Sequence, residues 1–175
     1  DDERFDEDRD TLLASMPENN VGLILNPGCD VESSRKAVSY ANKYPFVYAA
    51  VGIHPDEVGC LNEENFAQMK ELFKEEKVVA VGEIGLDYYW DNEPHEVQQK
   101  WFIRQLELAG EVKKPVIIHS REAAADTMYI MKNYAVHCIL VVICIFITVL
   151  ASVQGTWFMQ LFTAIPIHVK WLKNM

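Results

Sequence analysis

The chain has 175 residues, enough for one domain with a core of its own, and 50% of them are hydrophobic. Its 16 basic and 26 acidic side chains give a formal net charge of −10, which argues against a nucleic-acid binder that works through a broad basic face. The four cysteines form no CxxC pair, so the sequence indicates neither a zinc knuckle nor a redox motif.

The first two predicted units each join an apolar run to a helix. The run Val21–Asn26 is followed by a helix predicted over Glu32–Lys43, for which Asp30 is a suitable N-cap. The run Val47–Ile53 is followed by a helix predicted over Glu63–Lys77, in which large apolar residues recur at helical spacing. Both runs are continuous rather than alternating, as expected for strands buried on both faces of a parallel sheet.

The next two units repeat this arrangement. The run Val78–Ile84 precedes a helix predicted over Pro94–Val112, and the run Pro115–His119 precedes one over Arg121–Tyr134. Successive strands begin 26 to 37 residues apart, the length of a βα unit. The pattern predicts an α/β protein, either a doubly wound sheet or part of a (β/α) barrel, and periodicity alone does not choose between them.

The composition changes sharply near Val136. All but two of the charged side chains lie in residues 1–135, whereas residues 136–175 carry only Lys170 and Lys173. We therefore expect one folded unit over 1–135 and an atypical apolar tail over 136–175. Three interpretations of the tail stay open: a buried barrel strand followed by a helix, a membrane-seeking segment, or a non-native continuation from an altered reading frame or spliced end.

Polar side chains cluster at the carboxyl ends of three successive predicted strands. The second strand leads to His54, and the third carries Glu83 with Asp87 just beyond it. The fourth ends at His119, two residues before Arg121. Because parallel α/β folds gather their sites at this end, these residues are candidate ligands for a divalent metal, with an arginine fork suited to phosphate oxygens.

This set of side chains predicts hydrolysis by a metal-activated water. A divalent metal can lower the pKa of a bound water toward ~7 and neutralise charge on a phosphodiester, and the sequence shows no serine or cysteine nucleophile elbow. Simpler roles stay open for His54, which can cap a turn before Pro55, and for Arg121, which can be a surface residue at a helix start. Glu83 is harder to explain without a partner or metal, because an unpaired buried carboxylate is costly.

Four segments carry a joint pattern. They are the V-G-I-H-P of Val51–Pro55, the V-G-E-I-G-L-D-Y of Val81–Tyr88, the spaced glutamine and apolar residues of Gln99–Ala109, and the P-V-I-I-H-S-R of Pro115–Arg121. Together these segments resemble the TatD family of metal-dependent deoxyribonucleases, within the metallo-dependent hydrolase superfamily. The resemblance covers about residues 1–138.

The resemblance implies a partial (β/α)8 TIM-like barrel of about four to five βα units and hydrolysis of DNA phosphodiester bonds. It implies one or two divalent ions (Zn, Mg or Mn), with Glu83 and His119 as catalytic metal ligands. By the same resemblance, His54 and Arg121 lie near the substrate phosphate. Asp87 is expected to support the site by contacting the metal ligands rather than the metal.

The sequence also departs from the family pattern. Family members carry an H-x-H pair at the end of the first strand, before a stretch like Asp1–Asp10, and this chain begins after that pair. A further histidine is expected on the strand after the fourth, where alignment through Val141–Cys144 places Ile143. A late aspartate ligand has no counterpart before Met175. The expectation is therefore a metal-poor chain with weak activity or none.

Two other functions stay open at this point. One keeps the fold but acts on small esters or amides, since a fold does not fix a substrate. The other is a non-catalytic fragment whose apolar tail docks to a membrane or partner. For the nuclease, DNA is the expected partner, with no stable protein partner implied. The acidic start at Asp1, unlike a basic leader, together with the unpaired cysteines, predicts a cytoplasmic location.

Overall fold

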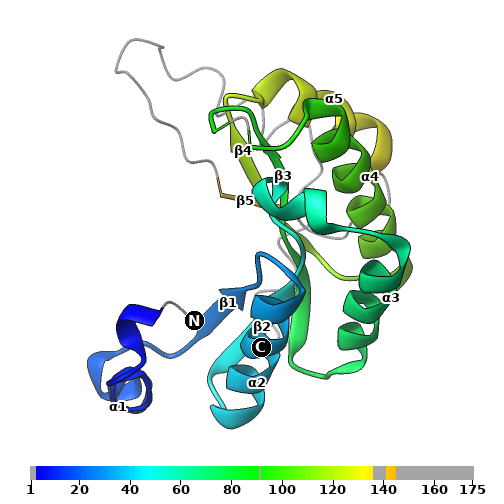
Figure 1. Cartoon of the computed structure of the whole chain (residues 1–175). Coiled ribbons are helices and arrows are strands. Elements are labelled where there is room, and N and C mark those ends of the chain that lie inside the picture. The colour runs from blue at the N-terminus through cyan, green and yellow to red at the C-terminus, as the bar shows by residue number, and fades with distance from the viewer. Residues whose placement is uncertain (1–2, 91, 136–140, 145–175) are drawn as a thin grey trace.

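The structure is a computed structural model that describes residues 3–90, 92–135 and 141–144. It contains one five-stranded parallel sheet with the strands in chain order. The strands are β1 (Ile24–Pro27), β2 (Val47–Val51), β3 (Val78–Asp87), β4 (Val116–Arg121) and β5 (Val141–Cys144). A doubly wound sheet reverses its strand order, whereas this one does not, and the sheet curls around one side (Figure 1). The partial barrel is thereby confirmed.

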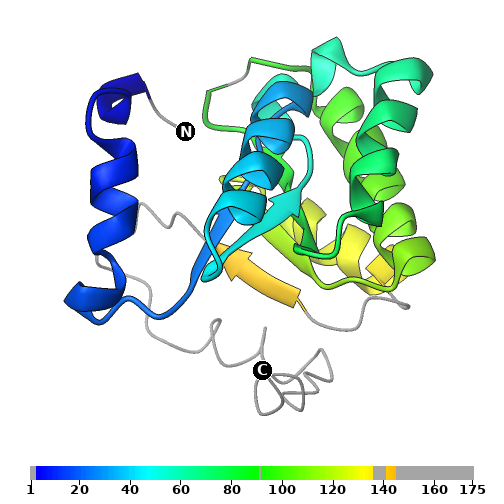
Figure 2. The same cartoon turned by 90° about the horizontal axis from the view of Figure 1, so that it is seen from below.

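Helices connect the strands and lie along the outer side of the curl, as Figure 1 shows for α3, α4 and α5. The α-helices are α1 (Arg9–Ser15), α2 (Val31–Lys43), α3 (Glu63–Glu71), α4 (His95–Val112) and α5 (Ala124–Tyr134). Short 3-10 turns are η1 (Glu3–Phe5), η2 (Pro17–Asn19), η3 (Pro55–Cys60) and η4 (Leu72–Lys74). Helix α1 lies apart from the helices that cover the sheet (Figure 2), and its Asp10 contacts Lys43 and Tyr44 at the end of α2.

Side-chain caps fix where two helices begin. The Asp30 carboxylate accepts the Ser33 N–H at 2.6 Å, so α2 starts as the sequence predicts. The Asn62 side chain accepts the N–H groups of Glu64 and Asn65, which starts α3 in the same way.

Several predicted boundaries were wrong. Strand β1 begins at Ile24 rather than at Val21, because Ile24 is the first residue that pairs with β2, opposite Val47. Helix α3 ends at Glu71 and tightens into η4, so the predicted end at Lys77 is too late. Strand β3 runs to Asp87, beyond the predicted Ile84, because it continues to pair with β4. For the same reason Arg121 ends β4 instead of starting a helix.

The sheet is apolar on both faces. A large cluster packs between the strands and the covering helices and includes Ile84, Phe102 and Ile118. A smaller cluster of Ala50, Ala80 and Ile117 packs separately, with Leu25 against it. Strands covered on both sides need continuous apolar runs, which is why the strands lack an alternating pattern.

Of the apolar tail, the structure describes only residues 141–144, which form β5. This strand pairs in parallel with β4, so that Ile118 lies opposite Ile143 and His119 opposite Cys144. The remaining expectations for 136–175, including the membrane-seeking interpretation, lie outside the described residues. Within the described part of the chain, no helix has the length and apolar character needed to cross a membrane.

Candidate metal centre

Three side chains from successive strands meet at one place. His54 follows β2, Glu83 belongs to β3 and His119 belongs to β4. One donor atom from each lies within 4.8 Å of the others, a spacing that can hold a metal ion. His119 is buried and the other two are partly buried. The structure therefore brings together the strand-end residues that the sequence singled out, with His54 inside the cluster.

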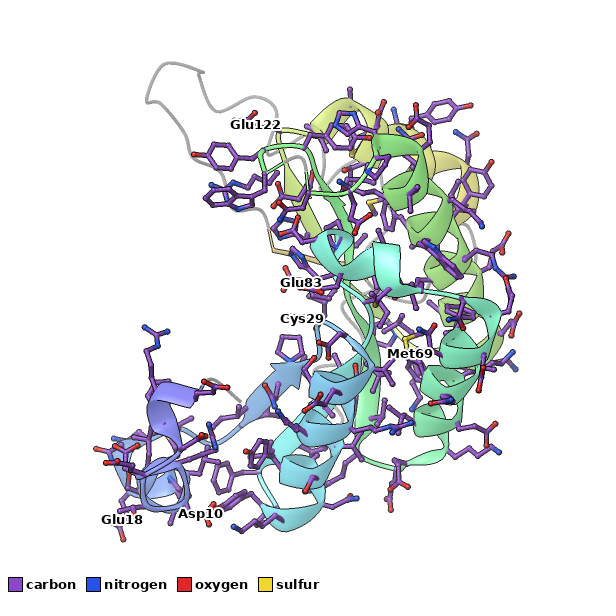
Figure 3. The ribbon with its side chains drawn as sticks, in the orientation of Figure 1. Asp10, Glu18, Cys29, Met69, Glu83 and Glu122 are labelled. Atoms are coloured by element: carbon purple, nitrogen blue, oxygen red, sulfur yellow. The ribbon has the colours of Figure 1, made fainter. Side chains whose placement is uncertain are left out.

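A register shift turns Glu83 toward this place. The pairing of β3 with β4 is irregular between Val81 and Ile84, the interval that contains Gly82 and Glu83. A Cβ atom on Gly82 would lie 2.6 Å from the Ile117 Cβ, so this close approach requires glycine. The Glu83 N–H leaves the β4 ladder and donates to the Gly28 carbonyl at 3.0 Å. Figure 3 shows Glu83 beside Cys29 on the inner side of the curl.

Two carboxylates hold the His119 ring. Its Nε2 lies 2.8 Å from the Asp87 Oδ2, and its Nδ1 lies 3.3 Å from the Glu83 Oε1. Burial works against the charged imidazole, but the two nearby carboxylates of Glu83 and Asp87 outweigh it and raise the pKa of His119. When Nε2–H donates to Asp87, the Nδ1 lone pair faces Glu83, the arrangement found where a carboxylate orients a metal-binding histidine.

The Glu83 Oε1 atom is buried and has no hydrogen-bond partner within the described residues. A buried carboxylate oxygen without a hydrogen bond is costly, and with the His119 proton on Nε2 the Nδ1 lone pair, 3.3 Å away, would add repulsion. A cation shared by Glu83, His119 and His54 would remove both costs. The donor set thus fits a divalent metal, although imidazole and carboxylate ligands together do not select one metal.

The His54 side chain does two things in the structure. Its Nδ1 accepts the Asp56 N–H at 3.3 Å and so caps η3, as the simpler interpretation expected. Its ring also meets the His119 ring edge-on, with centroids 4.3 Å apart. Burial, with the nearby charge of His119, lowers the pKa of His54 and favours its neutral form. Because Nδ1 serves the cap, Nε2 is the atom left for a ligand.

Two buried glutamines of α4 position the segments that carry these residues. The Gln98 side chain accepts the Asp87 N–H at 2.8 Å and donates to the Asp87 carbonyl. Gln105 does the same for Ile53, next to His54, with distances of 2.8 and 3.1 Å. Sequence reasoning missed Gln98, although a glutamine on the apolar face of a helix is a signal that such a role exists.

Arg121 lies beside the cluster rather than within it. It pairs in register with Asp87, and its guanidinium carbon lies 3.7 Å from the centre of the Tyr89 ring. Its Nε is buried without a hydrogen-bond partner among the described residues. Sequence reasoning also missed Tyr89 and Trp90, for which the signal was an aromatic pair directly after a strand end.

Cys29 lies beside Glu83 (Figure 3). Although Cys29 as a whole is exposed, partial desolvation of its thiol, together with the negative charge of Glu83, raises the pKa of Cys29 to about 11. The side chain is therefore a thiol rather than a thiolate near neutral pH.

Among known proteins, a family model described as "TatD related DNase" matches residues 1–171. The chain is 40% identical over 131 residues to the uncharacterized metal-dependent hydrolase YabD of Bacillus subtilis, covering 75% of this chain and 51% of the relative. It is 36% identical over 122 residues to the 3′-5′ ssDNA/RNA exonuclease TatD of Cronobacter sakazakii, covering 70% and 46%.

Two solved structures share the fold. The TatD homologue YjjV of Escherichia coli superposes with a TM-score of 0.71 and 32% identity, over 77% of this chain and 52% of the homologue. An uncharacterized amidohydrolase of Saccharomyces cerevisiae superposes with a TM-score of 0.58 and 25% identity, over 71% and 44%. This chain therefore spans about half the length of the proteins it matches.

Proposed function

The chain belongs to the TatD-related DNase family, and on this premise we propose that it forms part of a metal-dependent hydrolase that cleaves phosphodiester bonds in DNA. The observation that carries this proposal is the convergence of His54, Glu83 and His119 on one place. The exonuclease name of the Cronobacter relative supports a nucleic-acid substrate.

Each residue of the cluster has a role in this proposal. Glu83, His119 and His54 hold a divalent cation, whose chemistry is to neutralise phosphate charge and acidify a water. We place His54 with the ligands, in preference to the phosphate contact that the resemblance implied, because its donor atom lies within the cluster. Asp87 fixes the orientation of the His119 ring through the 2.8 Å contact to Nε2.

Arg121 binds the phosphate. Its guanidinium offers N–H groups in a fork that matches two phosphate oxygens, next to the cluster. The chain is acidic as a whole, so attraction to DNA has to come from this local cation and the bound metal instead of a basic surface. Such a site contacts one phosphate at a time, which suits an enzyme that removes nucleotides one after another from a strand.

The test measures cation binding and hydrolysis together. The purified chain is titrated with Zn²⁺, Mg²⁺ or Mn²⁺ by calorimetry and then given end-labelled single-stranded DNA. Glu83→Gln keeps the shape but removes the ligand charge, so it should lose both properties. Glu111→Gln is the matched control, because Glu111 is an exposed carboxylate on α4 paired with Lys70. Equal cation affinity and hydrolysis in wild type and Glu83→Gln would reject the proposal.

The described part of the chain supplies three donor side chains, the fewest that a catalytic zinc site normally uses, and Ile143 stands where the family pattern has a further histidine. We therefore expect turnover by these 175 residues well below that of a full-length relative. Turnover equal to that of the relative would contradict this expectation.

Hydrolysis of small amides or esters is the second candidate, favoured by the amidohydrolase title of the yeast structure. Arg121→Ala separates the two functions, because it removes a phosphate contact that a neutral amide or ester does not need. Unchanged hydrolysis of a small neutral ester in Arg121→Ala, by a chain that hydrolyses no DNA in its wild-type form, would favour this candidate.

A further inference from the structure

Two aromatic side chains lie exposed next to the cluster. Tyr89 is 46% exposed and Trp90 is 57% exposed, and both belong to the segment between β3 and α4. Their rings contact each other edge-on with centroids 4.7 Å apart. Adjacent aromatic rings left in water are unfavourable unless something covers them, so this pair is a candidate contact surface.

One carboxylate ties this pair to the cluster. The Asp87 Oδ1 accepts the N–H of Tyr89 at 2.9 Å and that of Trp90 at 3.4 Å. The Oδ2 of the same side chain holds the His119 Nε2. Asp87 is only 1% exposed and is fixed in turn by Gln98. The aromatic pair therefore sits at a set distance from the candidate metal ligands.

Arg121 completes the surface. Its guanidinium carbon lies 3.7 Å from the centre of the Tyr89 ring and 5.1 Å from that of Trp90. These cation–π contacts hold the rings in place and leave guanidinium N–H groups for an anion. The surface thus combines flat π-faces with one cation, which matches a nucleotide, a flat base joined to a phosphate.

We propose that Tyr89, Trp90 and Arg121, the aromatic platform, stack an unpaired base of a single-stranded nucleic acid whose phosphate lies at the metal cluster. This inference rests on the proposed function and adds the side chains that hold the base. Bases in a duplex are stacked on their neighbours and cannot offer a free face, so the platform suits the single-stranded substrates that the name of the Cronobacter relative gives. Stacking also supplies affinity that the net charge of −10 does not.

The test is a binding measurement without catalysis. Fluorescence anisotropy follows a labelled single-stranded DNA octamer in excess chelator, beside an octamer of the same length whose sugars lack bases. The wild type should bind the normal octamer more tightly than the abasic one. Trp90→Ala should weaken binding of the normal octamer about 5- to 150-fold, the effect of losing one stacked base. It should leave binding of the abasic octamer unchanged.

Two further variants control for folding and for general aromatic loss. Trp90→Phe keeps a ring and should retain most of the affinity. Tyr129→Ala removes an aromatic side chain that is 67% exposed on α5, outside the platform, and should bind like the wild type. If Trp90→Ala fails to fold, the comparison of the two octamers on the wild type still decides.

Equal affinity for the two octamers, or no measurable affinity for either, would overturn the platform. So would a loss in Tyr129→Ala as large as that in Trp90→Ala. The outcome is separable from that of the proposed function. A platform effect in a chain that hydrolyses no DNA with any metal leaves the platform standing and removes the nuclease. Hydrolysis without preference for the normal octamer does the reverse.

Discussion

At the amino-terminal end of the sheet, Lys77 donates to the carbonyls of Ala41, Tyr44 and Val47, and Lys114 donates to that of Val78. At the carboxyl-terminal end, by contrast, the buried Glu83 Oε1, Asp56 Oδ1 and Arg121 Nε have no hydrogen-bond partner in the part of the chain that the structure describes.

At the first end, lysine ammonium groups satisfy backbone carbonyls. At the second end, polar atoms are left to bind a group that is not among the described residues. In (β/α) barrels the first end serves stability and the second serves function. Stability and function therefore lie at opposite ends of the same curled sheet, so a substitution at one end should change stability and a substitution at the other should change cation binding.

Glu83→Gln should break the carboxyl-terminal end most severely. Replacing a ligand carboxylate should lower cation affinity by more than about 100-fold, since even residues behind metal ligands cost 10- to 100-fold. Without cation, the free energy of unfolding should stay the same or rise, because an incompletely paired buried charge is removed. Calorimetric titration and urea unfolding in chelator measure the two quantities. A large loss of stability in chelator would show that Glu83 is structural.

Lys77→Met should produce the reverse signature at the other end. Methionine keeps the apolar stem but leaves three carbonyls without the ammonium group that they now share. The expected loss of stability is about 1.5–3 kcal/mol, the range for a hydrogen bond to a charged group. Urea unfolding measures it. Cation affinity at fixed folded fraction should not change, and a drop there would mean that the two ends are coupled.

Asp87→Asn should separate cation binding from octamer binding at the carboxyl-terminal end. The amide can still accept the Tyr89 N–H but no longer offers a negative charge to the His119 Nε2. Cation affinity should fall about 10- to 100-fold. The Tyr89–Trp90 segment should keep its place, so binding of a single-stranded octamer in chelator should stay near the wild-type value. Weakening of both by the same factor would show that Asp87 acts only by holding the fold.

The sequence was sufficient to predict what strand order alone determines. His54, Glu83 and His119 follow or belong to successive parallel strands, and such strands place their carboxyl ends together. The sequence was insufficient where a long-range contact determines the end of a strand or the role of a side chain. Strand β3 runs past Ile84 because β4 pairs with it, and the role of Gln98 depends on the helix α4 packing over Asp87. No local pattern contains these contacts.

Lys43→Ala should have the smallest effect and so sets the baseline for the comparison. Lys43 forms an exposed ion pair with Asp10, at 2.5 Å, which joins α1 to the end of α2. Exposed pairs contribute little to stability because water and salt screen them. Urea unfolding should therefore shift only slightly, and cation and octamer binding should not change. A loss of unfolding free energy as large as that of Lys77→Met would mean that α1 stabilises the sheet. The stabilising region at the amino-terminal end would then include α1 as well as the strands.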